Sequence, residues 1–427
     1  MHKVYHFRIS WHTGFLSSFS ATRLPYYLTF LAILTALCSN SACNVLIGAA
    51  TGSLLFYRFR FGHPLLFPPV KAPLALFLLA TIVSIALSGH ILAGWPGVRK
   101  FYLYLILLLV ASTFRELGDV RRLVVALCGV MSLSALWSFY QFWQKVEQAR
   151  ILGRNSYEYR IEERITGFMS HWMTLSGEEM IVILTVLSLL FFAGELRRRG
   201  WILAGLAIIL FSLLLGYTRS VWLGCALGCL YLVWIWNRRF LLLAPVPILA
   251  LLWLDPAYLG ERLRSTVQPH GDTDSNRFRL FCRRTGWEMI KAHPWFGLGP
   301  EQVNAQFKSF IPAELGQPPA NGWYGHLHNV YLQYAAERGI PGLIAFLWFL
   351  GKMLFDFIRA LGRTPREDRE RRWILHGCIA VMLGVLAAAF YEHNLGDGEV
   401  LTLFLAICAC GYRAVGAYQP FSGICSF

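Results

Sequence analysis

Charge is scarce in this sequence. Only 15% of the 427 residues are Asp, Glu, Lys or Arg, whereas 56% are hydrophobic, and the mean hydropathy is positive. A soluble domain of this size typically carries roughly 25% charged residues, so the composition excludes that class. Because the apolar residues occur in long runs, we predict an all-α polytopic membrane protein.

Cysteine motifs and a cleavable signal peptide are also lacking. Most of the ten cysteines fall inside apolar runs, where a thiol behaves as a small hydrophobic side chain, and none has the spacing of a zinc site. Cys38 and Cys43 lie at a membrane edge, where a disulfide is an alternative to the ordinary packing that we favour. The amino terminus has no small-residue cleavage site, so the run 24–37 is expected to remain as the first span.

The basic residues, which give a net charge of +15, predict the orientation. Such a charge suits a nucleic-acid ligand, but these residues form short clusters between apolar runs, as in the inside loops of membrane proteins. Nucleic acid is therefore not an expected partner. When the amino terminus is placed inside, every short basic loop falls on one side, and residues 359–372 form the densest. Both termini are thus expected in the cytoplasm, with residues 255–339 outside.

A helix needs roughly 20 apolar residues to cross the hydrocarbon core, and this rule predicts twelve spans. Residues 1–254 hold the first nine, residues 255–339 form a polar outer loop domain, and residues 340–427 hold the last three and a cytoplasmic tail. The predicted spans are 24–38, 43–57, 70–88, 99–114, 123–143, 172–193, 201–217, 220–236, 240–254, 340–358, 373–391 and 398–414.

Two outer segments, 144–170 and 255–339, carry arginines on the side where positive charge is normally depleted. A guanidinium binds phosphate oxygens through a fixed bidentate fork, so an anionic ligand at this face is one explanation. Contact with lipid headgroups at a helix end is the alternative for any single arginine, including Arg164 in the first segment.

Within the outer loop domain, the spacing of apolar residues predicts an interfacial helix at 277–293, ended by Pro294. A short second helix is expected within 301–310, and residues 311–323, rich in proline and glycine, are expected to be irregular. A further helix begins near His328 and leads into the tenth span.

His328 is the first candidate catalytic residue. A neutral histidine at the outer end of a helix can accept a proton from a sugar hydroxyl, although an interfacial histidine bonded to a backbone carbonyl is the simpler alternative. His326 nearby raises the possibility of a metal site, but no carboxylate or thiolate lies at ligand spacing.

Ionisable residues inside or beside the spans form the next group of candidates. Arg219 lies where the seventh span meets the eighth, at membrane depth near the outer surface, and is well placed to bind a lipid-linked phosphate. Glu178 and Glu179 lie within the sixth span, where each either pairs with an arginine or binds substrate. His171, Glu392 and Asp397 lie at outer span ends and are possible substrate contacts.

Metal is not expected. Residues 272–274 are a literal D-x-D sequence, a pattern by which sugar-nucleotide enzymes hold a divalent ion, but a solvated turn and helix cap explains it better because no apolar strand flanks it. The first outer loop, 39–42, has no acidic residue to anchor an ion.

Four stretches together resemble the O-antigen ligase and polymerase family of bacterial membrane glycosyltransferases. They are a Gly-Phe-x-x-His segment at 167–171, a Thr-Arg-Ser segment at 218–220, the stretch from Arg279 through 293–300, and the stretch from His328 through 337–342. Their order, and the long outer loop between the ninth and tenth spans, carry the resemblance more than any single motif does.

The resemblance implies an inverting, metal-independent transfer of O-antigen, without a cofactor, from undecaprenyl diphosphate to a hydroxyl of lipid A-core. It places the protein in the bacterial inner membrane, among membrane lipids, with a periplasmic active site. By position, Arg219 and Arg279 would hold the diphosphate, with Arg164 completing the wall, and His328 would activate the acceptor. Arg277 is the alternative to Arg279, because Cys282 and Arg283 replace an aromatic residue expected there.

Two related activities and one unrelated activity remain open from the sequence. A polymerase of the same glycans, or a ligase that glycosylates protein, would share these motifs and differ only in the acceptor. A transporter gated by the outer loop is the more distant alternative. Transporters tend to show inverted repeats with polar groups near the midplane, whereas here the polar candidates gather at the outer face.

Overall fold

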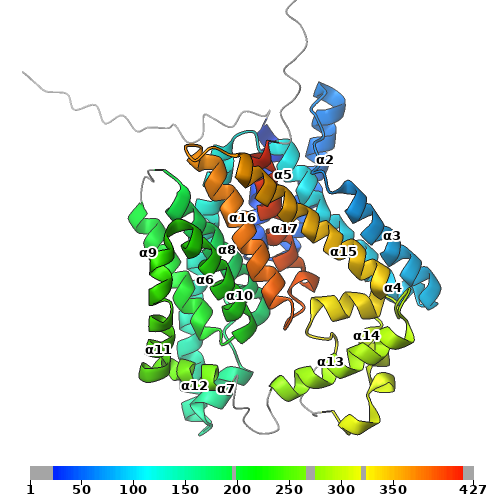
Figure 1. The fold of residues 1–427 in the computed structure, drawn as a ribbon, viewed down its shortest axis with the longest axis vertical. Coiled ribbons are helices and arrows are strands. Elements are labelled where there is room, and N and C mark those ends of the chain that lie inside the picture. Colours follow the sequence, from blue (N-terminus) through cyan, green and yellow to red (C-terminus); the bar gives the residue numbers. More distant parts are fainter. Residues whose placement is uncertain (1–22, 195–198, 266–274, 319–323, 417–427) are drawn as a thin grey trace, which may run out of the picture.

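The computed structural model describes residues 23–194, 199–265, 275–318 and 324–416 (Figure 1). Within these ranges the protein is helical and contains no strand. Nine of the described helical segments are long and apolar enough to cross a membrane, and two shorter apolar helices accompany them, α1 (Leu24–Ala36) and α9 (Arg199–Leu215). The all-α polytopic fold predicted from the sequence is therefore confirmed.

The long segments follow the predicted order along the chain. The span predicted at 99–114 is composite, because α4 (Ile91–Arg99), a 3₁₀ turn (Lys100–Tyr104) and α5 (Leu105–Thr113) follow one another. The other candidate spans are α2 (Asn40–Phe61), α3 (Lys71–Ser88), α6 (Leu117–Ile151), α8 (Trp172–Phe192), α10 (Arg219–Asn237) with the 3₁₀ turn Arg238–Leu243, α15 (Val330–Arg363), α16 (Arg369–Ala388) and α17 (Gly398–Val415).

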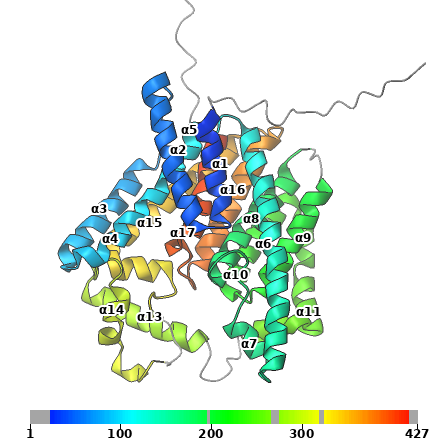
Figure 2. The ribbon, with the colours of Figure 1, turned by 180° about the vertical axis from the view of Figure 1, so that it is seen from behind.

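Three helices, α8, α16 and α17, form the centre of the bundle. More than two thirds of each apolar stretch is buried, whereas every other candidate span has less than half buried. They pack against one another, with α10 against α8 and α16, and α5 against α17. Helices α15 and α16 lie in front in Figure 1, and α1 and α6 lie in front in the reverse view of Figure 2. A helix that is hydrophobic all round belongs in such a centre.

The number of spans stays a prediction. The ninth predicted span, 240–254, contains α11 (Pro245–Leu254), whose 10 residues reach roughly 15 Å, about half the hydrocarbon thickness. The chain nevertheless returns to its starting face in this region. Arg262, which follows α11, donates a hydrogen bond to the carbonyl oxygen of Tyr217, which precedes α10.

One end of the bundle carries the short helices α7 (Ser156–Glu162), α12 (Leu259–Arg264), α13 (Ser275–Ala292) and α14 (Val303–Gln306), and we call this end the loop face (Figure 1). Helix α13 matches the interfacial helix predicted at 277–293, and α14 with a 3₁₀ turn (Phe307–Phe310) matches the short helix predicted at 301–310. A separate small core, which includes Cys282, Met289 and Leu327, holds the loop region together.

A break in α15 fixes the loop region to the bundle. Gly339 has φ 71° and ψ 174°, so the helix stops and restarts there, next to the predicted start of the tenth span at residue 340. A side chain at this position would place its Cβ 2.2 Å from the carbonyl oxygen of Trp295. Only glycine combines this positive φ with so close a backbone approach.

The break frees two carbonyl groups of α15, and the loop region uses them. The backbone N–H of Leu298 donates to the carbonyl of Ala336 at 2.8 Å, and that of Gly299 donates to the carbonyl of Glu337 at 2.9 Å. The hydroxyl of Ser84, on α3, donates to the same Glu337 carbonyl at 2.7 Å. Buried backbone groups need such partners, so the break and the turn at 294–299 stabilise each other.

Candidate active site

His328 lies in a tight turn at the start of α15. Its φ of 48° is in the left-handed region, which is uncommon for a residue with a side chain. The turn is held by Asn329, whose side-chain oxygen accepts from the N–H of Leu332 at 2.9 Å and whose amide group donates to the carbonyl of Phe390 at 2.9 Å. The two hydrogen bonds of Asn329 thus hold the backbone of His328 in one conformation.

Glu392 is the buried carboxylate around which the site is built. One of its oxygens forms an ion pair with Arg279, from α13, and accepts a hydrogen bond from the hydroxyl of Ser220, from α10, at 3.1 Å. Its other oxygen lies 3.5 Å from Nδ1 of His328. Burial alone raises the pKa of Glu392, but the charge of Arg279 and the contacts with His328 and Ser220 outweigh it and lower this pKa to about 2.

This arrangement determines which nitrogen of the neutral His328 ring carries the proton. With Nδ1 facing the ionised Glu392, the proton of a neutral ring belongs on Nδ1, which leaves Nε2 with a free lone pair. Nε2 is buried and has no hydrogen-bond partner among the described residues. The edge-to-face ring of Phe278, 4.8 Å away between centroids, restricts the imidazole further. A base held by a carboxylate in this way is ready to accept a proton.

His326 supports the turn and is uncharged. Its Nδ1 accepts a hydrogen bond from the backbone N–H of His328 at 3.1 Å, and the two rings lie 4.1 Å apart between centroids. Burial, and then the nearby His328, lower the pKa of His326 to about 3. A neutral His326 avoids placing a second positive charge against the catalytic candidate.

Several arginines gather around Arg164. Arg219 donates to the side chains of Ser265 at 3.2 Å and Asn276 at 3.0 Å, which tie it to the loop region. Arg164 stacks on the ring of Trp172, at 5.3 Å. Its pKa is lowered to about 9, first by burial and then by the charges of Arg262, Arg279 and Arg219, with Glu392 opposing them. These arginines lie close enough to act on one another's charge, so together they can bind a single anionic ligand.

Helix geometry separates Arg279 from Arg277. Residues two positions apart in an α-helix point in directions that differ by about 200°, so the side chains of Arg277 and Arg279 leave α13 on opposite faces. Arg279 reaches Glu392, whereas Arg277 is exposed. Arg279 thus shares Glu392 with His328, and Arg164 lies within electrostatic reach of Arg219 and Arg279, whereas Arg277 does not reach Glu392. Their role at the site stays a prediction.

A cavity of about 730 Å³, the active-site cavity, opens at this point of the loop face. Five predicted residues line it, namely His328, His326, His171, Glu392 and Asp397. His171 caps α8 by accepting from the N–H of Met173 at 3.2 Å, and burial lowers its pKa. Asp397 caps α17 and accepts a hydrogen bond from the hydroxyl of Thr174. The cavity therefore joins the loop-face ends of α8, α15 and α17.

Sequence reasoning missed several residues of this site. Ser220 bonds to Glu392, and buried Arg262 contributes to the arginine cluster. Glu337 and Arg338 form a buried ion pair in the cavity wall. Arg262 was visible as one of many loop arginines, but nothing in the sequence showed that it is buried. Glu337 and Arg338 lie in the stretch 337–342, which carried part of the family resemblance, so the sequence did hold a signal for this pair.

Glu178 and Glu179 are not among the residues that line the active-site cavity. Both are fully buried in α8, and none of their oxygens has a hydrogen-bond partner within the described part of the chain. The structure therefore does not bring the candidate Glu179 to the site. Its possible role in substrate binding stays a prediction.

The sequence also raised candidate metal ligands and a candidate disulfide. In the described ranges, no three His, Cys, Asp or Glu side chains are grouped so as to hold a metal ion. The D-x-D sequence at 272–274 lies outside the residues that the structure describes. Cys38 and Cys43 are both free thiols, so the alternative of a disulfide between them is wrong.

Comparison with known proteins agrees with the geometry. A search of curated proteins found no match. The family described as O-Antigen ligase matches residues 204–347, a range that contains Arg219, Arg279, the loop region and His328. The residues that carried the resemblance at 218–220, 279–300 and 328–342 lie inside this match. The match supports the O-antigen ligase family for the part of the chain that holds Arg219, Arg279 and His328.

Proposed function

We propose that this protein transfers a glycan from undecaprenyl diphosphate to an acceptor hydroxyl at the loop face. The family match supports a membrane glycosyltransferase of the O-antigen ligase or polymerase type. The observation that carries the proposal further is the open Nε2 of His328, held by Glu392 beside an arginine cluster. A base next to an anion site is what this reaction needs.

In the proposed step, Nε2 of His328 takes the proton of the acceptor hydroxyl as its oxygen attacks the anomeric carbon of the donor glycan. The bond between that carbon and the diphosphate oxygen breaks, and its electron pair stays on the diphosphate. Attack opposite the leaving group inverts the anomeric configuration. The proton on His328 then passes to the released diphosphate or to solvent, which restores the base.

Each charged residue has a role in this step. Arg219, Arg279 and Arg164 stabilise the negative charge that develops on the departing diphosphate, which guanidinium groups can do without a metal ion. Glu392 keeps the His328 ring in one orientation and stabilises the imidazolium while it carries the proton. His171 and Asp397 in the cavity wall are positioned to contact the sugar.

Among acceptors we favour lipid A-core, with a growing glycan chain or a protein as the alternatives. The test is reconstitution of the purified protein in vesicles with labelled undecaprenyl-diphosphate glycan and each acceptor in turn. We expect glycosylated lipid A-core and free undecaprenyl diphosphate in equal amounts. Transfer only to a second lipid-linked glycan would make the protein a polymerase, and passage of the glycan across the membrane without transfer would make it a transporter.

The proposed orientation places the loop face in the periplasm, because the short basic loops lie at the opposite end of the spans. Ser309 is exposed on the loop face and suits a reporter cysteine. In intact spheroplasts of a strain with Cys38→Ser, Ser309→Cys should react with a membrane-impermeant maleimide. Labelling only after the cells are broken open would reverse the orientation.

A further inference from the structure

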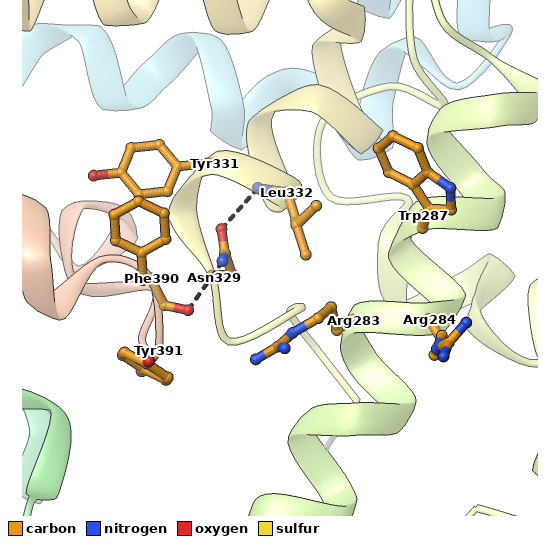
Figure 3. A pocket seen from close by; sticks show the side chains of 8 residues that line it. All are labelled: Arg283, Arg284, Trp287, Asn329, Tyr331, Leu332, Phe390 and Tyr391. Carbon is orange, nitrogen blue, oxygen red and sulfur yellow. Dashed lines mark hydrogen bonds between the residues drawn. The ribbon is translucent and has the colours of Figure 1, made fainter.

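A second cavity, of about 580 Å³, opens on the loop face between α13, the start of α15 and the turn after α16 (Figure 3). We call it the aromatic groove. In Figure 3, Arg283, Arg284 and Trp287 approach it from α13, while Phe390 and Tyr391 face them from the other side. Its lining residues are Arg283, Arg284, Trp287, Asn329, Tyr331, Leu332, Phe390 and Tyr391.

The aromatic groove leads to the catalytic candidate. Arg279 and His328 line a narrow space of about 10 Å³, the size of one water molecule, together with five residues of the groove. The five shared residues are Arg283, Asn329, Leu332, Phe390 and Tyr391. His328 therefore stands between two cavities, and a transferase with two large substrates needs two approaches to one reacting position.

The groove walls present two kinds of chemistry. Trp287 is 55% exposed, Phe390 57% and Tyr391 40%, so their rings are accessible to a ligand in the groove. Arg283 and Arg284 are also exposed, and neither forms a hydrogen bond or ion pair with another described residue. Aromatic faces cover sugar rings or lipid chains, and free guanidinium groups bind phosphate.

These observations distinguish the groove from an ordinary interfacial belt. Aromatic and basic residues at a membrane surface often contact lipid headgroups wherever a helix ends. Such contacts do not require a passage to a buried base. Here Asn329, which caps α15 and fixes the His328 turn, is itself part of the groove wall, so an occupant touches the residue next to the catalytic candidate.

We infer that the aromatic groove binds the acceptor, and that this acceptor is a glycolipid whose sugars carry phosphate groups. Arg283 and Arg284 bind the phosphates, while Trp287, Phe390 and Tyr391 cover the sugars and the adjoining lipid. The bound acceptor then directs its hydroxyl through the narrow space toward His328. This inference rests on the proposed function, since it assigns one of the two substrates of that reaction.

The decisive experiment compares two double variants, each of which removes two positive charges, in the full-length protein reconstituted in vesicles. Arg283→Gln/Arg284→Gln removes the groove arginines, and Lys291→Gln/Lys308→Gln removes two exposed charges from the same loop region outside the groove. Transfer is measured with a phosphorylated glycolipid acceptor and with the same acceptor after phosphatase treatment.

For the groove variant we expect the KM for the phosphorylated acceptor to rise about 10-fold to 100-fold, as for the loss of two charge-assisted contacts. The KM for the donor, and for the dephosphorylated acceptor, should stay within about 2-fold, and the lysine control should match the wild type throughout. Trp287→Ala should raise the KM for both acceptors, because it removes contact with the sugar. An unchanged acceptor KM in the groove variant, or an equal rise for both acceptors, overturns the inference.

A binding measurement separates this inference from the proposed chemistry. His328→Ala protein should bind the phosphorylated glycolipid as the wild type does, and the two groove substitutions should abolish that binding in the same background. If anionic phospholipid vesicles without sugars compete equally well, the groove is a headgroup contact and the inference fails. If binding behaves as expected but the wild type transfers nothing to this acceptor, the proposed function fails instead.

Discussion

The two cavities beside His328 are built differently. The active-site cavity is lined by buried groups with fixed partners, such as Glu392, which contacts Arg279 and Ser220, and Glu337, which pairs with Arg338. The aromatic groove is walled by exposed arginines and rings with few contacts of their own. Chemistry requires fixed groups, because a misplaced base or charge costs rate, whereas recognition of a flexible glycolipid tolerates mobile ones.

The largest expected effect tests His328, which lines the active-site cavity and the narrow space next to the aromatic groove. His328→Ala should lower transfer by roughly 10²-fold to 10⁴-fold, the usual contribution of a positioned general base. His90→Ala is the matched control, because His90 is an exposed histidine that is not among the residues lining either cavity. The measurement is the transfer rate at saturating donor and acceptor. Transfer by the His328 variant at the wild-type rate would show that His328 is not the general base.

Glu392→Gln tests whether the carboxylate orients that base. We expect transfer to fall about 100-fold, as when a supporting carboxylate is lost, because an amide cannot stabilise the imidazolium. The same variant carries a pH signature. The pKa of Glu392 is lowered from 4.5 to about 2 in the folded state, so its carboxylate stabilises the fold above about pH 4.5 and loses this effect as the pH falls toward 2.

Thermal unfolding from detergent micelles measures that signature. The excess stability of the wild type over Glu392→Gln should be constant near neutral pH and shrink below about pH 4.5. If the difference between the two proteins is the same at every pH, Glu392 is not an ionised partner of Arg279.

A smaller effect separates the two faces of α13. Arg279→Lys should lower transfer about 10-fold, because an ammonium cannot reproduce the bidentate contact of a guanidinium with phosphate, and Arg219→Lys should behave alike. Arg277→Lys should leave transfer within about 2-fold, since Arg277 is exposed and points away from Glu392. Equal losses in Arg277→Lys and Arg279→Lys would mean that α13 sits differently during the reaction.

The smallest expected effect concerns metal ions. Transfer by the wild type in an excess of EDTA should match transfer without it, because the proposed step relies on arginines for charge stabilisation. Loss of activity on chelation, restored by a divalent ion, would instead point to the D-x-D sequence at 272–274 as a ligand pair.

The sequence predicted the fold well because the bilayer restricts the possibilities. Apolar runs of sufficient length specify helices, and the interfacial helix α13 and the break before the tenth span carried local signals in Pro294 and Gly339. The predicted span at 240–254 was less secure, since α11 is only 10 residues long and a 3₁₀ turn precedes it.

The site was only partly predictable. Arg219 was visible because an ionisable group at membrane depth is costly without a role. His328 was visible from its place at the start of a predicted helix, and Arg279 only from the family resemblance. Pairings were not visible, because Glu392 meets Arg279 across 113 residues and Ser220 across 172, and no local pattern encodes such distances. The aromatic groove was missed for the same reason, since α13 and the turn after α16 meet only in the folded chain.

The most direct test of the account is a two-substrate kinetic comparison of Arg279→Lys with Arg283→Gln/Arg284→Gln. These residues lie within two turns of one helix, but Arg279 pairs with Glu392 of the active-site cavity, whereas Arg283 and Arg284 line the aromatic groove. We expect the first variant to impair kcat and the KM for the lipid diphosphate donor, and the second to raise only the KM for the phosphorylated acceptor. If both variants change both KM values alike, the two cavities do not serve separate substrates and the central claim is contradicted.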